Sequence, residues 1–166
     1  MAREASAYHR AAADAITRYG GHVAKYPGDG VMAFFGYPEA HDNDAEHAAR
    51  AGLELLDAIA KLGEEPKRPK LAARVGIDSG AVVVGAGAGK ETDVFGDAPN
   101  IAARVQAAAT PDTIVVTAAT QRLISGLFVV EDRGAQTLKG IEQPVQLYQI
   151  MRPSADGLQQ RQPRVP

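Results

Sequence analysis

The 166-residue sequence contains no cysteine and no tryptophan. The absence of cysteine excludes disulfide bonds, a thiolate nucleophile and cysteine-ligated zinc, and it fits a cytoplasmic protein. Phenylalanine is scarce, at 4 residues, so an aromatic platform for stacking nucleic-acid bases is not expected. No apolar run is long enough to cross a bilayer, and the N-terminus has no apolar core of the signal-peptide kind.

A strong charge of either sign is also missing. The 18 Lys and Arg residues against 20 Asp and Glu give a net charge of −2, so there is no basic footprint for nucleic acid. Hydrophobic residues make up 45% of the chain and charged residues 23%, which is typical of a globular protein. The chain is long enough to bury one hydrophobic core. We expect one domain over residues 1–151. A polar tail or linker over residues 152–166 leaves room for an attached regulatory domain.

The pattern of apolar residues predicts an α+β fold, because the helices do not strictly alternate with the strands. Helices are expected over residues 2–19, from a cap at Asp42 or Asn43 to about residue 62, from a cap at Asp97 over residues 98–109, and over 118–124. Strands are expected within residues 22–36, in two pieces of 71–84, and over 92–95, 113–116, 127–132, 135–138 and 145–151.

The run Pro27-Gly28-Asp29-Gly30 lies between two apolar runs, which predicts a β-hairpin. Asp29 has two interpretations. Aspartate is a favoured turn residue, and most Asp-Gly pairs mean no more than that. A carboxylate at a hairpin tip can also ligate Mg²⁺. Lys25 lies on the strand near the same tip, where it could reach the same ligand. The alternative interpretation is an exposed strand lysine with no binding role.

The stretch from Glu91 to Val105 reads as a strand end, a tight turn and a helix start. Asn100 and Arg104 are four residues apart and therefore share one helix face. With the strand-end carboxylate of Asp93 they form a plausible site for a phosphorylated ligand, and a solvated surface helix is the alternative. The preceding glycine-rich run over residues 85–90 does not match a phosphate-binding Walker A loop, so we interpret it as a loose hairpin turn.

Four stretches, in this order, resemble the catalytic domain of class III adenylate and guanylate cyclases. They are YGGHVAKYPGDGVMAFFG, LAARVGIDSGAVVVG, TDVFGDAPNIAARV and LKGIEQPVQLYQI, and the resemblance covers residues 15–150. It implies a ferredoxin-like βαββαβ core with additional C-terminal strands. It also implies a head-to-tail homodimer with active sites at the interface, and conversion of ATP to 3′,5′-cyclic AMP and pyrophosphate.

The resemblance also implies how metal and base are bound. Asp29 matches the second of two metal-binding aspartates, which hold Mg²⁺ or Mn²⁺ with two ions per site in the family. Lys25 matches a lysine that donates to the purine ring, and Asp93 matches the residue that accepts from the adenine amino group. Adenine presents an amino donor and a ring-nitrogen acceptor, whereas guanine reverses that polarity. The pair therefore indicates ATP rather than GTP.

Three further positions match family residues that act on the sugar and the phosphates. Asn100 matches the asparagine that orients the ribose. Arg104 matches the arginine that neutralises charge at the α-phosphate, a task that suits a guanidinium. Lys139 matches a lysine on the terminal phosphates.

The family begins with a strand reading roughly Phe-x-Asp, which carries the first metal ligand, and a loop that holds the phosphates. Residues 1–21 match the helix after that loop. We therefore expect the first core strand and the first metal ligand to be missing and a sheet edge to be unpaired. A fragment or misassigned start explains this best, because the later site residues are intact. A segment removed or supplied by another chain, and a degenerate relative, are the alternatives.

Two functions follow. One is an adenylate cyclase, and the other is a non-catalytic nucleotide-binding or dimerisation module that regulates an attached domain. A diguanylate cyclase is disfavoured, because the hairpin lacks the Gly-Gly-Asp/Glu-Glu-Phe sequence of that class.

Overall fold

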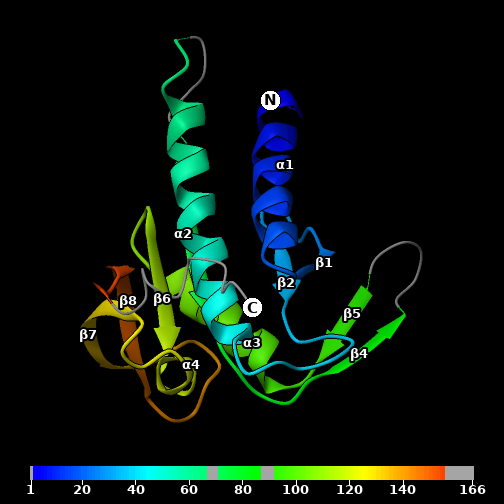
Figure 1. The fold of residues 1–166 in the computed structure, drawn as a ribbon. Helices are drawn as coiled ribbons and strands as arrows, with labels where there is room; N and C mark the ends of the chain where they lie inside the picture. Colours follow the sequence, from blue (N-terminus) through cyan, green and yellow to red (C-terminus); the bar gives the residue numbers. More distant parts are fainter. Residues whose placement is uncertain (1, 67–70, 87–91, 156–166) are drawn as a thin grey trace, which may run out of the picture.

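The computed structural model describes residues 2–66, 71–86 and 92–155, and within these ranges the fold is α+β (Figure 1). Its elements in chain order are α1 (Ala2–Arg18), β1 (His22–Lys25), β2 (Met32–Phe34), α2 (Asp44–Gly63), β3 (Arg74–Ile77), β4 (Val83–Ala86), β5 (Thr92–Phe95), α3 (Asp97–Ala108), β6 (Thr113–Thr117), α4 (Ala118–Leu123), β7 (Phe128–Gln136) and β8 (Val145–Pro153). In this part of the chain we find no helix with the length and apolarity that a membrane span requires.

Helices α1 and α2 lie side by side, with α1 in contact with β1 and α2 in contact with β3 and β6 (Figure 1). Small residues on α1, such as Ala12 and Ala15, are almost fully buried against Leu55 and Ile59 of α2. The small side chains let the two helices approach closely. A second cluster joins α2 to the main sheet, with Ile114 of β6 fully buried at its centre.

The described strands form three separate sheets. Strands β1 and β2 form one antiparallel hairpin, and β4 and β5 form another. The main sheet has the order β3-β6-β8-β7, in which β3 and β6 are parallel and the other pairs are antiparallel. The parallel pair brings the carboxyl ends of β3 and β6 together.

Two strand edges in the middle of the molecule are unpaired, as the sequence predicts. Among the described strands, β2 pairs only with β1, and β3 pairs only with β6. Val31, next to β2, and Val75, on β3, nevertheless pack against the same cluster of α1 and α2 side chains. The hairpin and the main sheet therefore share one apolar core without sharing a backbone hydrogen-bond ladder.

One predicted helix cap is wrong, and the other is confirmed in position. Asp97 lies inside the first turn of α3, and Gly96 is the N-cap, with no side-chain hydrogen bond. Gly96 has a φ of 138°, a conformation that favours glycine. The helix therefore begins one residue earlier than a cap at Asp97 would predict. Asn43 is the N-cap of α2, but its side chain makes no capping hydrogen bond. Its amide instead lies 3.1 Å from the Nε2 atom of His47.

Two strand predictions also change. The strands expected over residues 127–132 and 135–138 are one strand, β7, whose register shifts between Asp132 and Gly134. Gly134 has a φ of 75° and absorbs the irregularity without ending the strand. Strand β8 continues to Pro153, so the predicted boundary at residue 152 falls inside it. The turn expected within residues 85–90 and the tail over residues 156–166 lie largely or wholly outside the described residues.

Candidate active site

The two hairpins bring Lys25 and Asp93 together. Lys25 ends β1 and Asp93 lies within β5, on hairpins that share no backbone pairing. The Nζ atom of Lys25 lies 4.0 Å from the Oδ1 atom of Asp93. The two side chains are 34% and 40% exposed, so an ion pair of modest strength joins them and both remain accessible to a ligand.

A cavity of about 890 Å³ lies between α1 and the two hairpins, next to this pair. It is lined by Val23, two residues before Lys25, and by Gly85, which lies directly across the β4–β5 hairpin from Asp93. Lys25 and Asp93 are not themselves among the residues that line the cavity, so the pair lies beside its wall.

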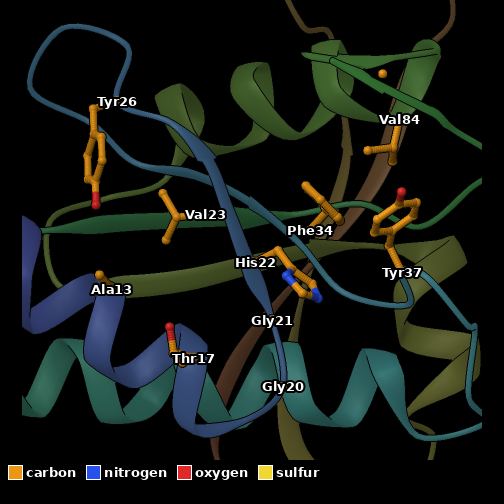
Figure 2. A pocket seen from close by; sticks show the side chains of 11 residues that line it. Ala13, Thr17, Gly20, Gly21, His22, Val23, Tyr26, Phe34, Tyr37 and Val84 are labelled. Carbon is orange, nitrogen blue, oxygen red and sulfur yellow. The ribbon is translucent and has the colours of Figure 1, made fainter. Parts of the chain in front are cut away.

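Aromatic side chains form much of the cavity wall. His22 stacks on Phe34 with ring centroids 5.4 Å apart, and Tyr37 meets Phe34 edge-on at 5.7 Å. Figure 2 shows Phe34, Tyr37 and Val84 gathered on one side of the cavity, with His22 next to them. Flat apolar surface beside a polar pair is suited to a heteroaromatic ring that carries polar atoms on its edge.

Asn100 and Arg104 are both exposed on α3, one helical turn apart. The opposite face of α3 holds Val105, which is fully buried. Gly76 of β3 allows the helix to lie this close, because a Cβ atom there would fall 2.3 Å from the backbone nitrogen of Gln106. The contact between β3 and α3 therefore fixes where the two polar side chains lie.

Asp29 lies exposed at the tip of the β1–β2 hairpin and makes no ion pair with another described residue. Burial raises the pKa of the nearby Tyr8 phenol above its ordinary value of 10.0, and the negative charge of Asp29 raises it further. Within the described residues no group of three or more His, Cys, Asp or Glu could hold a metal ion. One hard carboxylate oxygen fits a Mg²⁺ ion that completes its shell with substrate phosphates and water, and does not fit an all-protein cage.

Lys139 is exposed in a turn, immediately after the buried Leu138. Within the described residues no ion pair or hydrogen bond joins the Lys25–Asp93 pair to Asp29, Asn100, Arg104 or Lys139.

Sequence reasoning missed a group of four polar side chains where β3 and β6 end. The Oγ1 atom of Thr117 donates to Oδ1 of Asp78 at 2.6 Å. The hydroxyl oxygens of Ser79 and Thr120 lie 2.8 Å apart. The sequence offered one indication of this group. Thr117 directly precedes the helix predicted over residues 118–124, and threonine is favoured at the N-cap of a helix.

Comparisons with known proteins show the family and the fold of this chain. Residues 11–152 match the model of the adenylate and guanylate cyclase catalytic domain. An adenylate cyclase of Mycobacterium tuberculosis is 28% identical over 127 residues, which are 75% of this chain and 28% of that protein. The chain therefore spans well under half the length of this curated relative.

Two solved structures are similar in fold and at the same level of identity. The adenylyl cyclase CyaB of P. aeruginosa has a TM-score of 0.85 and 27% identity, over 93% of this chain and 84% of that one. The guanylyl cyclase Cya2 has a TM-score of 0.83 and 27% identity, over 93% and 81%. Of these two structures, one is named an adenylyl cyclase and the other a guanylyl cyclase.

Proposed function

The chain belongs to the family of adenylate and guanylate cyclase catalytic domains, and on that premise we propose that it is a class III adenylate cyclase, which converts ATP to 3′,5′-cyclic AMP and pyrophosphate. The observation that carries the choice of ATP is the 4.0 Å approach of Lys25 to Asp93. The equal identity to CyaB and Cya2 leaves this choice to the residues of the site.

The base is proposed to bind with its polar edge against this pair. The carboxylate of Asp93 accepts from the amino group at C6 of adenine, and the ammonium of Lys25 donates to the ring nitrogen N1. Guanine presents an oxygen and an N–H at these places, so each contact would become repulsive. A ligand whose hydrogen-bonding groups mismatch those of the site is bound less well, so this pair favours adenine.

The reaction is attack of the ribose 3′-hydroxyl on the α-phosphorus, which forms the cyclic phosphodiester and expels pyrophosphate. Asn100 is proposed to orient the ribose, and Arg104 to neutralise the charge that spreads over the α-phosphate oxygens. Lys139 is proposed to bind the terminal phosphates. Positioning and charge stabilisation supply most of the rate enhancement in phosphoryl transfer, so residues of these types are sufficient without a covalent intermediate.

Asp29 is the residue proposed to hold Mg²⁺ or Mn²⁺, two of which act per site in the family. When bound there, a divalent cation would supply Lewis-acid stabilisation of the phosphate oxygens and would lower the pKa of a bound hydroxyl. Asp29 supplies one hard oxygen ligand at an accessible hairpin tip, which supports this role.

We further propose that the chain works as a head-to-tail homodimer in the cytoplasm. Val83 and Phe95 support the dimer, because they face each other across the β4–β5 hairpin and are 67% and 57% exposed. Apolar side chains left this exposed mark association surfaces. Light scattering on Val83→Glu should then show a smaller mass than the unchanged chain at the same concentration. The lack of cysteine supports the proposed cytoplasmic location.

The test of catalysis is cyclic AMP formation by the purified chain from ATP and Mn²⁺, measured beside an Asp29→Ala control. Product above that of the control supports the cyclase. Absence of product, with ATP still bound, supports the second candidate, a non-catalytic nucleotide-binding or dimerisation module that regulates an attached domain. One observation favours that candidate, since within the described residues no group of three or more His, Cys, Asp or Glu could hold a metal ion.

A further inference from the structure

The connection from β3 to the β4–β5 hairpin is hydrogen-bonded to the end of β6. Strands β3 and β6 are parallel, with Ile77 opposite Val116, so the residues that follow each of these lie side by side. These residues are Asp78 and Thr117, and the Thr117 hydroxyl donates to the Asp78 carboxylate at 2.6 Å. A hydrogen bond to a charged group is stronger than one between neutral groups. The first residue of the connection is therefore held in one place.

A second contact holds the next residue. The hydroxyl oxygens of Ser79 and Thr120 lie 2.8 Å apart, and Thr120 is completely buried. Thr117 is 3% exposed and also caps α4 by accepting from the backbone nitrogen of Thr120. Buried hydroxyls that lose their partners are costly, so this group of four side chains favours a single arrangement.

The connection over residues 78–82 reaches both parts of the candidate site. A Cβ atom on Gly80 would lie 3.6 Å from the side chain of Ala98, at the start of the helix that carries Asn100 and Arg104. A Cβ atom on Gly96, directly after β5, would lie 3.0 Å from the backbone oxygen of Ala81. The connection therefore packs against the start of α3 and against the end of the strand that carries Asp93.

Apart from the connection, the β4–β5 hairpin is held by the packing of β5 against β1 and against α3. Among the described strands, β4 and β5 pair only with each other. The placement of Asp93 relative to Lys25 therefore depends on the connection and on a few side-chain contacts, and no continuous backbone ladder fixes it.

We propose that Thr117 and Thr120 are positioning residues that, through Asp78 and Ser79, fix the β4–β5 hairpin and so set the distance between Asp93 and Lys25. Through that distance they determine how well the site distinguishes adenine from guanine. This last consequence rests on the proposed function, whereas the placement of the hairpin does not. In this role the two threonines act only through the connection and the hairpin.

The placement is tested directly by cross-linking. The chain has no cysteine, so Lys25→Cys with Asp93→Cys introduces the only two thiols. The rate of intramolecular disulfide formation, measured in dilute solution and resolved by electrophoresis, reports how often the two positions meet. The rate is compared in backgrounds carrying Thr117→Val, Thr117→Ser and Thr113→Val.

The three backgrounds separate positioning from general destabilisation. Thr113→Val is the matched control, because it removes a hydroxyl from the same strand at the opposite end, where it donates to the backbone oxygen of Thr110. Thr117→Val should slow cross-linking at least about fivefold, whereas Thr117→Ser keeps the hydroxyl and should restore the rate. Equal rates in Thr117→Val and Thr113→Val overturn the proposal. If Thr117→Val does not fold, Ser79→Ala gives the same comparison at a less buried position.

The consequence for the base is tested in the chain that keeps Lys25 and Asp93. Calorimetric titration with ATP and with GTP, each with Mg²⁺, gives the ratio of the two affinities. Thr117→Val should reduce this ratio at least about fivefold, and Thr113→Val should leave it unchanged. An unchanged ratio in Thr117→Val overturns the specificity role. If the unchanged chain binds neither nucleotide, the proposed function fails, and the cross-linking rates still decide the positioning role.

Discussion

Lys25 and Asp93 meet at 4.0 Å from two hairpins that no backbone hydrogen bond between described residues connects. In the absence of a nucleotide each is the other's counter-charge. Under the proposed function, a purine bound here would exchange one partly exposed ion pair, which contributes little by itself, for two contacts with the base edge. The pair is therefore suited to release its contact when the ligand arrives.

Exchanging the two charges should exchange the base preference. Lys25→Glu with Asp93→Lys keeps an ion pair between the hairpins but places an acceptor where guanine presents N–H and a donor where it presents oxygen. We expect the ratio of ATP affinity to GTP affinity to fall at least about tenfold, measured by calorimetry with Mg²⁺. Asp93→Asn alone serves as the control for loss of the ion pair. An exchanged variant that still prefers ATP would contradict the assignment of these residues to the base.

Gly76→Ala should destabilise the fold and displace α3. The added methyl group would lie 2.3 Å from the Gln106 nitrogen and 2.6 Å from the Ala102 oxygen, which are backbone atoms that cannot rotate away. We expect a loss of about 1–3 kcal/mol in the free energy of unfolding, measured by urea denaturation. Gly85→Ala is the matched control in β4, where the nearest atom would be 3.9 Å away. Equal stability of the two variants would show that β3 and α3 are less closely packed than described.

The two ion pairs at i and i+4 on α2 should differ sharply in strength. Arg50 is 5% exposed, and its Nε atom lies 2.8 Å from Oε2 of Glu46, whereas Asp57 and Lys61 are largely in solvent. Arg50 also lies over the Phe128 ring at 5.2 Å. Arg50→Ala should cost about 3–5 kcal/mol, because it leaves a partly buried carboxylate without its main counter-charge.

Double-mutant cycles measured by chemical denaturation test this difference. The pair of alanine substitutions at Glu46 and Arg50 should cost clearly less than the sum of the single substitutions. The same cycle at Asp57 and Lys61 should be additive within error. Additive behaviour at the buried pair would show that it is not coupled.

Tyr8 should make the fold sensitive to alkaline pH. Burial, with a smaller contribution from Asp29, raises the pKa of its phenol above 10.0 in the folded chain, so the folded state holds this proton more tightly than the unfolded state. The resulting stabilisation is complete below the unfolded pKa and is lost as pH rises through the folded pKa. Between about pH 9 and about pH 11, the unchanged chain should lose more stability than Tyr8→Phe, as measured by urea midpoints. Parallel losses in both chains would contradict this.

The local elements were predictable because their signals lie within a few residues. The turn around Asp29 and the strands on either side of it form the predicted hairpin, and α2 and α3 lie within one or two residues of their expected ends. The exception at Asp97 has a local cause, since the left-handed backbone of Gly96 takes the cap position. Strand β7 continues through Gly134 because the β7 residues before and after it pair with β8. This pairing outweighs the preference of glycine for a turn.

The arrangement of the site was predictable only through the resemblance. No pattern in the sequence brings Lys25 next to Asp93, because their hairpins meet by packing and not by pairing. Asp78 and Thr117 likewise meet because β3 and β6 are parallel, which a sequence of this kind does not specify. The roles of Asn100, Arg104 and the other matched residues remain predictions.

The division of the strands into separate sheets has a consequence for hydrogen exchange. Helix α1 with β1 and β2 forms a unit that shares side-chain packing with the main sheet but no backbone ladder. Such units can open without global unfolding, so amides of β1 and β2 should exchange faster than those of β6 and β8. Because Lys25 lies on this unit and Asp93 does not, a bound nucleotide would link the two. Protection of the β1 amides should then rise with nucleotide concentration, while the four-stranded sheet, already the slowest to exchange, changes little.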